Sequence, residues 1–244
     1  MRACTNADCA NYFILESQHT ISQFAEKIHQ KPKEAQDKFF QLLEFVVFQL
    51  NYVPVKELIS CSILLKSHVS LPCSQRCVES LLSILRFSPL FKDVFREVGI
   101  LEVFVQCLAR YADLLKSQQQ TEEDGDVYDL PEPQSALGRR VMETVSVLLA
   151  GSAANAAVFR ESGGSQRVHE MIVYPDCSQL ALGILQQLML CAGGEDEMGT
   201  VLAFMNNAPF SQIGLKIDIL KSLLGCLRDS HRTRTMFPQG LAFL

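Results

Sequence analysis

Cys73 and Cys77 lie four residues apart, and His68 precedes them by five positions. Thiolate and imidazole groups are preferred zinc ligands, so this cluster has the chemistry of a partial metal site. A structural zinc site needs four ligands, and no second pair of Cys or His at ligand spacing completes it. The four-residue spacing instead continues through Leu81 and Leu85 as one apolar helix face. We therefore predict core thiols and no metal here. The same interpretation applies to four cysteines that lie among apolar neighbours: Cys61, Cys107, Cys191 and Cys226.

Residues 124–129 have the acidic spacing that opens a calcium-binding loop. Such a loop needs Gly at its sixth position and Glu at its twelfth, where this chain has Asp129 and Ser135. The pattern therefore predicts no calcium site.

Catalytic patterns are also absent from the sequence. The five histidines are scattered, and none has a partner at a spacing typical of a dyad. The sequence contains no phosphate-binding glycine loop, nucleophile elbow or metalloprotease helix. We therefore predict a protein that is not an enzyme and uses no cofactor. The alternative is a catalytic site assembled in space from residues that are distant in sequence.

A group of basic residues near the carboxyl end is the one candidate binding surface. It consists of Lys216, Lys221, Arg228, Arg232 and Arg234, against Asp218 and Asp229. The simpler interpretation, which we favour, is a solvated outer face with cations near helix ends. The alternative is a surface that contacts anionic lipid or an acidic segment, including one of this chain.

Composition bounds the class of protein. The chain has 244 residues, of which 48% are hydrophobic and 20% charged, so it can bury a substantial core. A net charge of −5 argues against nucleic acid as the main partner. No apolar run approaches the ~18 residues of a membrane span, and no signal peptide is evident. Nine cysteines without a secretory signal then predict reduced thiols in a cytoplasmic protein.

Apolar spacing is helical almost throughout, which predicts an all-α fold. Prolines mark the expected helix starts: Pro32 opens a segment that runs to Leu50, Pro54 opens the next, and Pro72 opens a third. Strand-like alternation between hairpin turns is missing. The elements that must position any site are therefore helices.

Two segments of the chain repeat one another. Residues 81–97 and 145–161 share their apolar positions and the string Phe-Arg-Glu at an offset of 64 residues, and Gly follows in both. A third copy near residue 223 matches at Leu227, Ser230 and Phe237, with an offset of 78. Residues 177–190 and 198–205 supply the helices of a weaker repeat in between. Periods near 40 residues predict an armadillo/HEAT-like α-solenoid of about five helical repeats.

The repeated signature has a local physical cause. We expect a short helix to bury Phe95 or Phe159, and Gly99 or Gly163 to end it in the left-handed conformation. The chain then turns sharply into a long helix that lines the inner surface of the array. Each repeat leaves an apolar face that only its neighbours can cover.

The expected domain organisation is one solenoid over residues 1–244, with a poorly defined start at 1–30. Residues 117–135 are strongly acidic and contain two prolines, so we expect them to form a disordered insert. A second, shorter acidic loop is expected at 193–197. Residues 238–244 form an atypical end, because Pro238 directly follows Phe237 where the earlier copies have Arg.

Four stretches carry a resemblance to a known family: residues 83–99, 158–164, 196–209 and 220–237. They resemble the amino-terminal armadillo-like region of large BEACH-domain proteins that also carry WD repeats and a FYVE domain. This is the autophagy-linked FYVE protein family, and its immune-cell paralogue is the better match. The resemblance covers roughly residues 70–237, and the atypical end suggests a truncated or alternatively spliced form.

That resemblance implies a non-enzymatic interaction scaffold in endosomal vesicle traffic and autophagy, with protein partners and antigen cross-presentation in dendritic cells. It implies contact with endosomal or autophagic membranes through those partners. The alternative is peripheral membrane association through the basic carboxy-terminal helix face. No ligand-binding residue can be transferred, because the matched motif is structural. The chain has no Trp, and this disfavours the Trp-dependent peptide recognition of armadillo import receptors.

Overall fold

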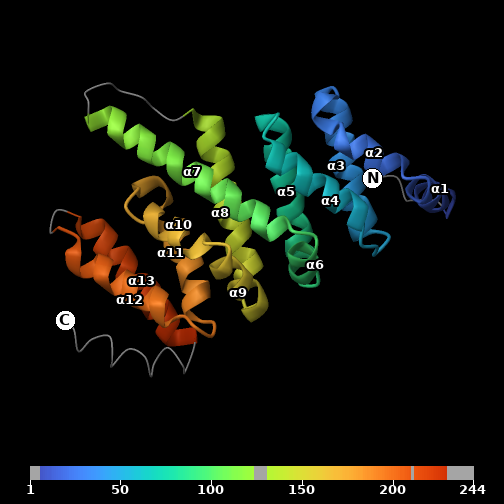
Figure 1. The fold of residues 1–244 in the computed structure, drawn as a ribbon. Coiled ribbons are helices and arrows are strands. Elements are labelled where there is room, and N and C mark those ends of the chain that lie inside the picture. The colour runs from blue at the N-terminus through green and yellow to red at the C-terminus, as the bar shows by residue number, and fades with distance from the viewer. Residues whose placement is uncertain (1–5, 124–130, 210–211, 230–244) are drawn as a thin grey trace. The chain divides into compact units, whose positions relative to one another are not determined.

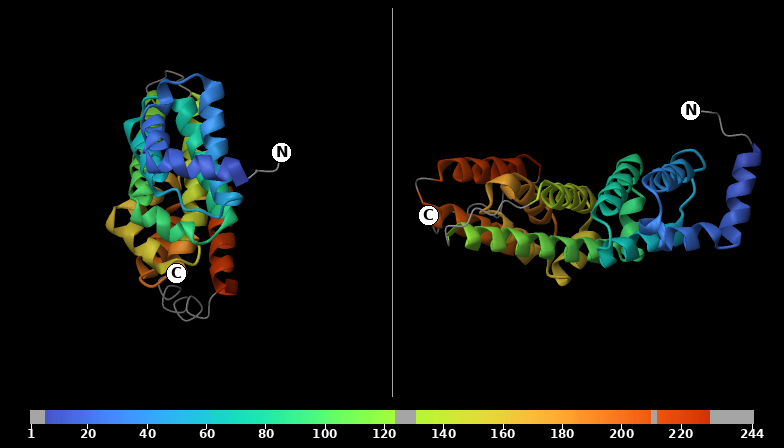
Figure 2. Two further views of the ribbon diagram at one scale, coloured as in Figure 1. Left: turned by 90° about the vertical axis from the view of Figure 1, so that its right-hand side faces the viewer. Right: turned by 90° about the horizontal axis from the view of Figure 1, so that it is seen from above.

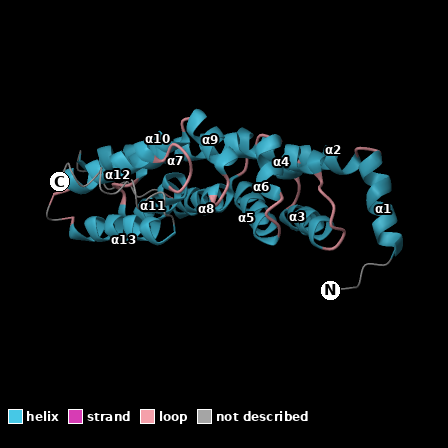
Figure 3. Cartoon of the chain, turned by 90° about the horizontal axis from the view of Figure 1, so that it is seen from below, coloured by secondary structure: helices cyan, strands magenta, loops and turns pink. Residues whose placement is uncertain are grey.

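A computed structural model of the chain describes residues 6–123, 131–209 and 212–229 (Figure 1). Within these ranges the regular elements are thirteen α-helices and one 3-10 helix, with no strand (Figure 3). The prediction of an all-α solenoid is thus confirmed. The chain divides into two compact units, residues 1–103 and 104–244.

The first unit begins with short helices and continues with longer ones. Its elements are α1 (Asn6–Ser17), α2 (Thr20–Glu26), η1 (Ile28–Gln30), α3 (Lys33–Phe48), α4 (Val55–Ser67), α5 (Leu71–Phe87) and α6 (Phe91–Glu97). Helix α3 packs against α5, and α2 packs against α4. Helices that are adjacent in space therefore alternate along the chain, which is the packing expected when each repeat covers the apolar face of the one before it.

The second unit contains most of α7 (Ile100–Glu123), whose green ribbon is easily followed in Figure 2. The helices that follow are α8 (Glu132–Leu149), α9 (Ala153–Glu161), α10 (Gly164–Met171), α11 (Pro175–Met189), α12 (Glu195–Asn207) and α13 (Ile213–Asp229). Helix α11 packs against α8 on one side and α13 on the other, and α10 contacts α9, α11 and α12. Helix α11 is thus the central member of this stack.

Prolines start the helices where the sequence predicts. Pro32 and Pro54 are the residues that directly precede α3 and α4, and Pro72 lies in the first turn of α5. A proline lacks the backbone N–H that would be unpaired in a first turn anyway. Helix α3 ends at Phe48, two residues earlier than predicted.

The repeated signature adopts the predicted conformation in both described copies. Phe95 and Phe159 have no exposed surface, and Gly99 and Gly163 have φ angles of +76° and +78°. Close packing adds a second requirement at Gly164, because a Cβ there would lie 2.6 Å from the Phe159 ring. The helices after the turn differ, however. Helix α7 has 24 residues and α10 only eight, so the expectation of a long helix after each turn is wrong for the second copy.

Three expectations about irregular segments need correction. Helix α7 continues to Glu123 and α8 begins at Glu132, so much of the acidic segment 117–135 is helical, and residues 124–130 lie outside the described residues. The acidic loop expected at 193–197 is largely the first turn of α12, where carboxylates favour the helix N-terminus. Helices also form within residues 1–30, from Asn6 onward. Ser230, Phe237 and residues 238–244 lie outside the described residues.

Candidate functional site

The predicted basic face is partly assembled on α13. Lys216, Lys221 and Arg228 belong to this helix, whereas Arg232 and Arg234 lie outside the described residues. Lys221 is well exposed and forms an ion pair with Asp218 at 3.3 Å. An exposed pair of this kind is screened by solvent and leaves the ammonium group accessible.

An exposed apolar stripe on the same helix was missed by the sequence analysis. The exposed fractions of its members lie between 46% and 62%, and they are Ile213, Ile217, Leu220 and Leu224. Steps of four, three and four residues put them on one helix face. Helical geometry places Lys216 on one side of the stripe and Lys221 and Arg228 on the other.

The opposite face of α13 is the one that packs on its neighbours. Ile219, Leu223 and Cys226 are buried there, and α13 contacts α11 and α12. The Ser222 hydroxyl donates a hydrogen bond to the Leu182 carbonyl of α11 at 3.4 Å. Helix α13 is therefore apolar on two faces, of which the described part of the chain covers one.

The structure describes the side chains of seven cysteines, and the prediction of core thiols holds for Cys61, Cys73, Cys77 and Cys226 but not for Cys107 and Cys191. Cys61, Cys73, Cys77, Cys177 and Cys226 are buried, whereas Cys107 and Cys191 are partly exposed. Burial raises the pKa of Cys73 to about 11, and it raises the pKa of both Cys107 and Cys177 to about 12. Because the thiolate is the reactive form, these three thiols are poor nucleophiles near neutral pH. Within the described residues no cluster of His, Cys, Asp and Glu could hold a metal ion.

A charged cluster links the repeats of the second unit. Arg160 donates from Nε to Glu197 Oε1 at 2.9 Å and from Nη2 to Glu197 Oε2 at 3.1 Å. Its guanidinium also donates to the Leu188 and Ala192 carbonyls near the end of α11, and Ser165 donates to Glu197. Burial alone would raise the pKa of Glu197, but the hydrogen bonds from Arg160 and Ser165 outweigh it and lower the pKa. The cluster fixes α9 against α11 and α12.

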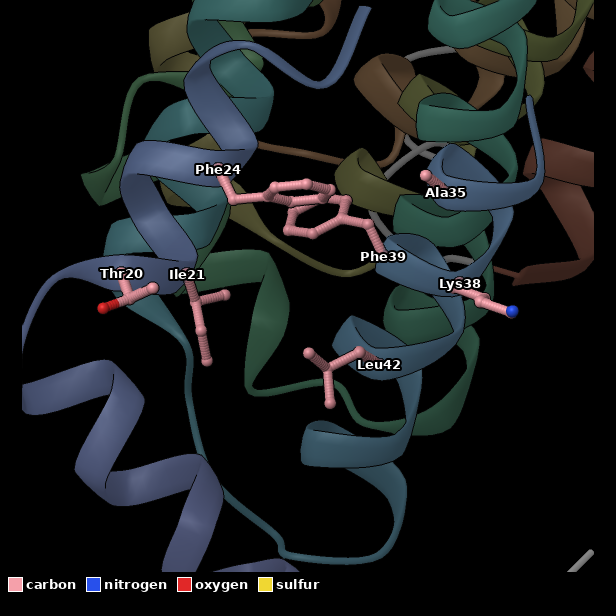
Figure 4. Close-up of a pocket in the computed structure, with 7 residues that line it drawn as sticks. All are labelled: Thr20, Ile21, Phe24, Ala35, Lys38, Phe39 and Leu42. Carbon is pink, nitrogen blue, oxygen red and sulfur yellow. The ribbon is translucent and has the colours of Figure 1, made fainter. Parts of the chain in front are cut away.

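A groove in the first unit lies between α2 and α3. Its cavity of about 360 Å³ is lined by apolar side chains and by Thr20 and Lys38. The rings of Phe24 and Phe39 lie against one another in its wall, with 6.2 Å between their centroids, and Ile21 and Leu42 lie nearby (Figure 4). Helix α2 packs mainly against α4, and α3 packs mainly against α5, which leaves the groove between α2 and α3.

A small inner cavity adjoins this groove. Ile21, Phe39 and Leu42 line both spaces, and Tyr12 and Glu57 also line the inner one. Glu57 is 2% exposed and Tyr12 5%, and the two Glu57 carboxyl oxygens and the Tyr12 hydroxyl have no hydrogen-bond partner in the described structure. Burial raises the pKa of Glu57 and that of Tyr12. No sequence pattern pointed to this pair, which comes from α1 and α4.

We expect the ionisation of Glu57 to destabilise the first unit. Folding raises the pKa of Glu57, so the folded state binds this proton more tightly than the unfolded state does. The protonated carboxyl therefore stabilises the folded state at low pH, and this contribution to stability is lost as the pH rises through the raised pKa. Glu57→Gln should therefore raise the free energy of unfolding by about 1–3 kcal/mol at neutral pH and have a smaller effect near pH 4. Urea titrations at both pH values measure the difference. An equal gain from Glu34→Gln, at an exposed position, would contradict this cause.

Comparisons with known proteins give the family. No family model matches the chain. It is 35% identical to mouse WD repeat- and FYVE domain-containing protein 4 and 33% identical to the human protein, over 219 residues and 89% of the chain in both cases. It is also 28% identical to the protein SPIRRIG of Arabidopsis thaliana over 109 residues, which are 45% of the chain and 3% of that protein.

The matched region is most of this chain but only a small part of each relative. The chain spans only 7% of the length of the mouse and human proteins. A solved structure of an engineered protein matches 93% of this chain and 70% of its own with 11% identity and a TM-score of 0.37, a likeness too low to support a conclusion. The match to these two proteins extends over nine-tenths of the chain and confirms the family predicted from its sequence. The chain belongs to the WD repeat- and FYVE domain-containing proteins and corresponds to one region of them.

Proposed function

We propose that the chain is a non-enzymatic interaction scaffold that holds protein partners in endosomal vesicle traffic and autophagy. The exposed apolar stripe of α13, flanked by Lys216, Lys221 and Arg228, is the observation that supports this function. Apolar area contributes most of the binding free energy, and flanking cations select the partner and speed its association. The partner that fits is an amphipathic helix with acidic residues beside its apolar face.

The named relatives support a role of this class. Their names describe proteins with WD repeats and FYVE domains, and this helical chain matches 7% of their length. A stack of helical repeats presents extended surfaces, which suits a role in positioning other proteins. We extend the proposal to antigen cross-presentation in dendritic cells, the role implied by the resemblance to the immune-cell paralogue.

The α13 stripe is tested by proximity labelling in cells. Ile217→Ser combined with Leu220→Ser should remove most of the enrichment of endosomal and autophagic proteins, because the centre of the apolar face is lost. The matched control is Ile59→Ser with Ile63→Ser, a pair of similarly exposed residues on α4. Unchanged enrichment in the α13 variant would refute this surface, and enrichment of chaperones alone in the parent chain would refute the scaffold function.

A second candidate is peripheral association with anionic membranes through the same helix. An apolar stripe between cations is also the pattern of helices that lie in a membrane interface. No described helix is long and apolar enough to span a bilayer. Flotation with vesicles that contain phosphatidylserine, compared with neutral vesicles, tests this candidate. Charge-reversing changes at Lys216, Lys221 and Arg228 should abolish flotation if it is correct, and absence of flotation by the parent chain would exclude it.

A further inference from the structure

A second groove lies in the second unit, at the turn between α10 and α11. This α10–α11 groove has a cavity of about 600 Å³, which is within the range for ligand sites. Three apolar side chains line part of it: Leu115 of α7, Val173 of the turn, and Pro175, the first residue of α11. Leu115 is buried and Val173 is exposed, so the groove is open to solvent along one edge. A cavity of this size can admit a long side chain of a partner.

Polar groups form the rest of the wall. Gln118 and Gln119 of α7 and Gln212, which directly precedes α13, supply side-chain amides. Each amide can both accept and donate hydrogen bonds. Tyr174 supplies an aromatic ring with a hydroxyl group, and Asp176 supplies a carboxylate. An aromatic ring, a carboxylate and several amides in one groove are the groups that recognise a flat organic cation.

The start of α11 holds Tyr174 and Asp176 in place. The Tyr174 N–H donates to the Met171 carbonyl at 3.2 Å, and the Tyr174 carbonyl accepts from the Ser178 N–H at 2.8 Å. Asp176 lies in the first turn of α11, where the helix N-terminus favours a carboxylate. Both groups therefore lie on a fixed backbone and not on a free loop.

Asp176 carries the uncompensated charge of the groove. It is exposed and forms no ion pair within the described residues. Two cations act on this end of α11, and both already have partners. Lys116 pairs with Glu170 at 3.0 Å, and Arg139 pairs with Glu132 at 2.7 Å. The groove therefore favours a cationic ligand.

We propose that the α10–α11 groove binds an arginine side chain of a partner protein. The guanidinium group of that arginine pairs with Asp176 and stacks on the ring of Tyr174, and glutamine amide oxygens accept its remaining N–H groups. Its apolar stem lies against Leu115 and Val173. A lysine fits less well, because its ammonium group is compact and strongly hydrated and does not stack on a ring.

The place of the groove favours a protein segment over a free small molecule. Gln212 directly precedes Ile213, with which the exposed apolar stripe of α13 begins. A segment that is bound along the stripe can therefore continue into the groove. The inference rests on the proposed scaffold function for its choice of a protein as ligand, but the ion pair with Asp176 does not require the stripe.

The test uses the full chain, labelled with nitrogen-15, and the capped peptide acetyl-Ala-Arg-Leu-Ala-amide. NMR titration should show saturable shifts at amides of the α10–α11 turn and of the end of α7. Peptides with citrulline or lysine in place of arginine should each bind about tenfold more weakly, because citrulline is planar but uncharged and lysine is charged but not planar. Equal affinity of either peptide would overturn the assignment to arginine. Free arginine that binds as tightly as the capped peptide would overturn the choice of a protein ligand.

Variants test the carboxylate and the groove separately. Asp176→Asn should weaken binding of the arginine peptide about tenfold. Asp196→Asn is the matched control, because Asp196 lies in the first turn of α12 as Asp176 does in that of α11, and it should leave binding unchanged. Gln119→Lys places a cation in the groove and should abolish binding, whereas Gln119→Glu should strengthen it. Equal effects of the two Asp variants, or of the two Gln119 variants, would place the peptide at another site and overturn the proposal.

Failure of the groove and failure of the scaffold function give different results. Ile217→Ser with Leu220→Ser should leave binding of the short arginine peptide unchanged, because these residues belong to the stripe and not to the groove. Absence of peptide binding, together with normal enrichment in the proximity labelling of the parent chain, would overturn the groove alone.

Discussion

Replacing Arg160 by methionine should lower the free energy of unfolding of the second unit by about 3–5 kcal/mol. The substitution leaves Glu197 without its ion-pair partner, although the Glu197 side chain is only 3% exposed. It also removes the donors to the Leu188 and Ala192 carbonyls near the end of α11. Chemical denaturation measures the loss of stability. Faster hydrogen exchange at the amides of α11 and α12 shows that the loss occurs in these helices.

Two comparisons identify the cause of that loss. Lys38→Met removes a well-exposed ion pair with Glu34 and should leave the free energy of unfolding almost unchanged. The double variant Arg160→Met with Glu197→Met should recover a large part of the stability, because no buried charge is then unpaired. A double variant as unstable as Arg160→Met alone would mean that packing of the guanidinium, and not the charge of Glu197, dominates.

The same ion pair should make stability depend on pH. Folding lowers the pKa of Glu197, so the carboxylate stabilises the folded state above the ordinary pKa of Glu, and this contribution is lost as the pH falls through the lowered value. The difference in stability between the parent chain and Arg160→Met should therefore narrow in acid. A difference that stays constant from neutral pH to pH 3 would contradict this linkage.

Truncation of either repeated phenylalanine should be similarly severe. Phe95→Ala and Phe159→Ala each remove a side chain with no exposed surface, and large-to-small changes of this kind cost about 3–5 kcal/mol. Thermal and urea unfolding should give comparable losses for the two, because both residues occupy the same position of the repeat. The control is Leu90→Ala, at a residue that is 56% exposed, and it should cost less than about 1 kcal/mol. A loss below 1 kcal/mol at either phenylalanine would show that the repeat core tolerates a cavity.

Local patterns in the sequence determined most of the fold. Apolar spacing gave the helices, and prolines marked their starts, because both effects act within one or two turns of chain. Gly99 and Gly163 were identified in the same way, since a left-handed turn depends on the residue that occupies it. The repeated phenylalanines were recognised because identical local units must bury identical positions, and the family was recognised from contiguous strings of residues.

Only the tertiary structure decided which residues meet. Arg160 and Glu197 are 37 positions apart, and Tyr12 and Glu57 are brought together from α1 and α4, so no spacing rule connects either pair. All five basic residues were identified from the sequence, and three of them lie on α13, but the apolar stripe beside them was not predicted. Helix α13 has apolar residues on two faces, and periodicity cannot tell which of them a neighbour covers. The contacts of α13 with α11 and α12 determine which of its faces is buried, because burial depends on what packs against a face and not on the composition of the face itself.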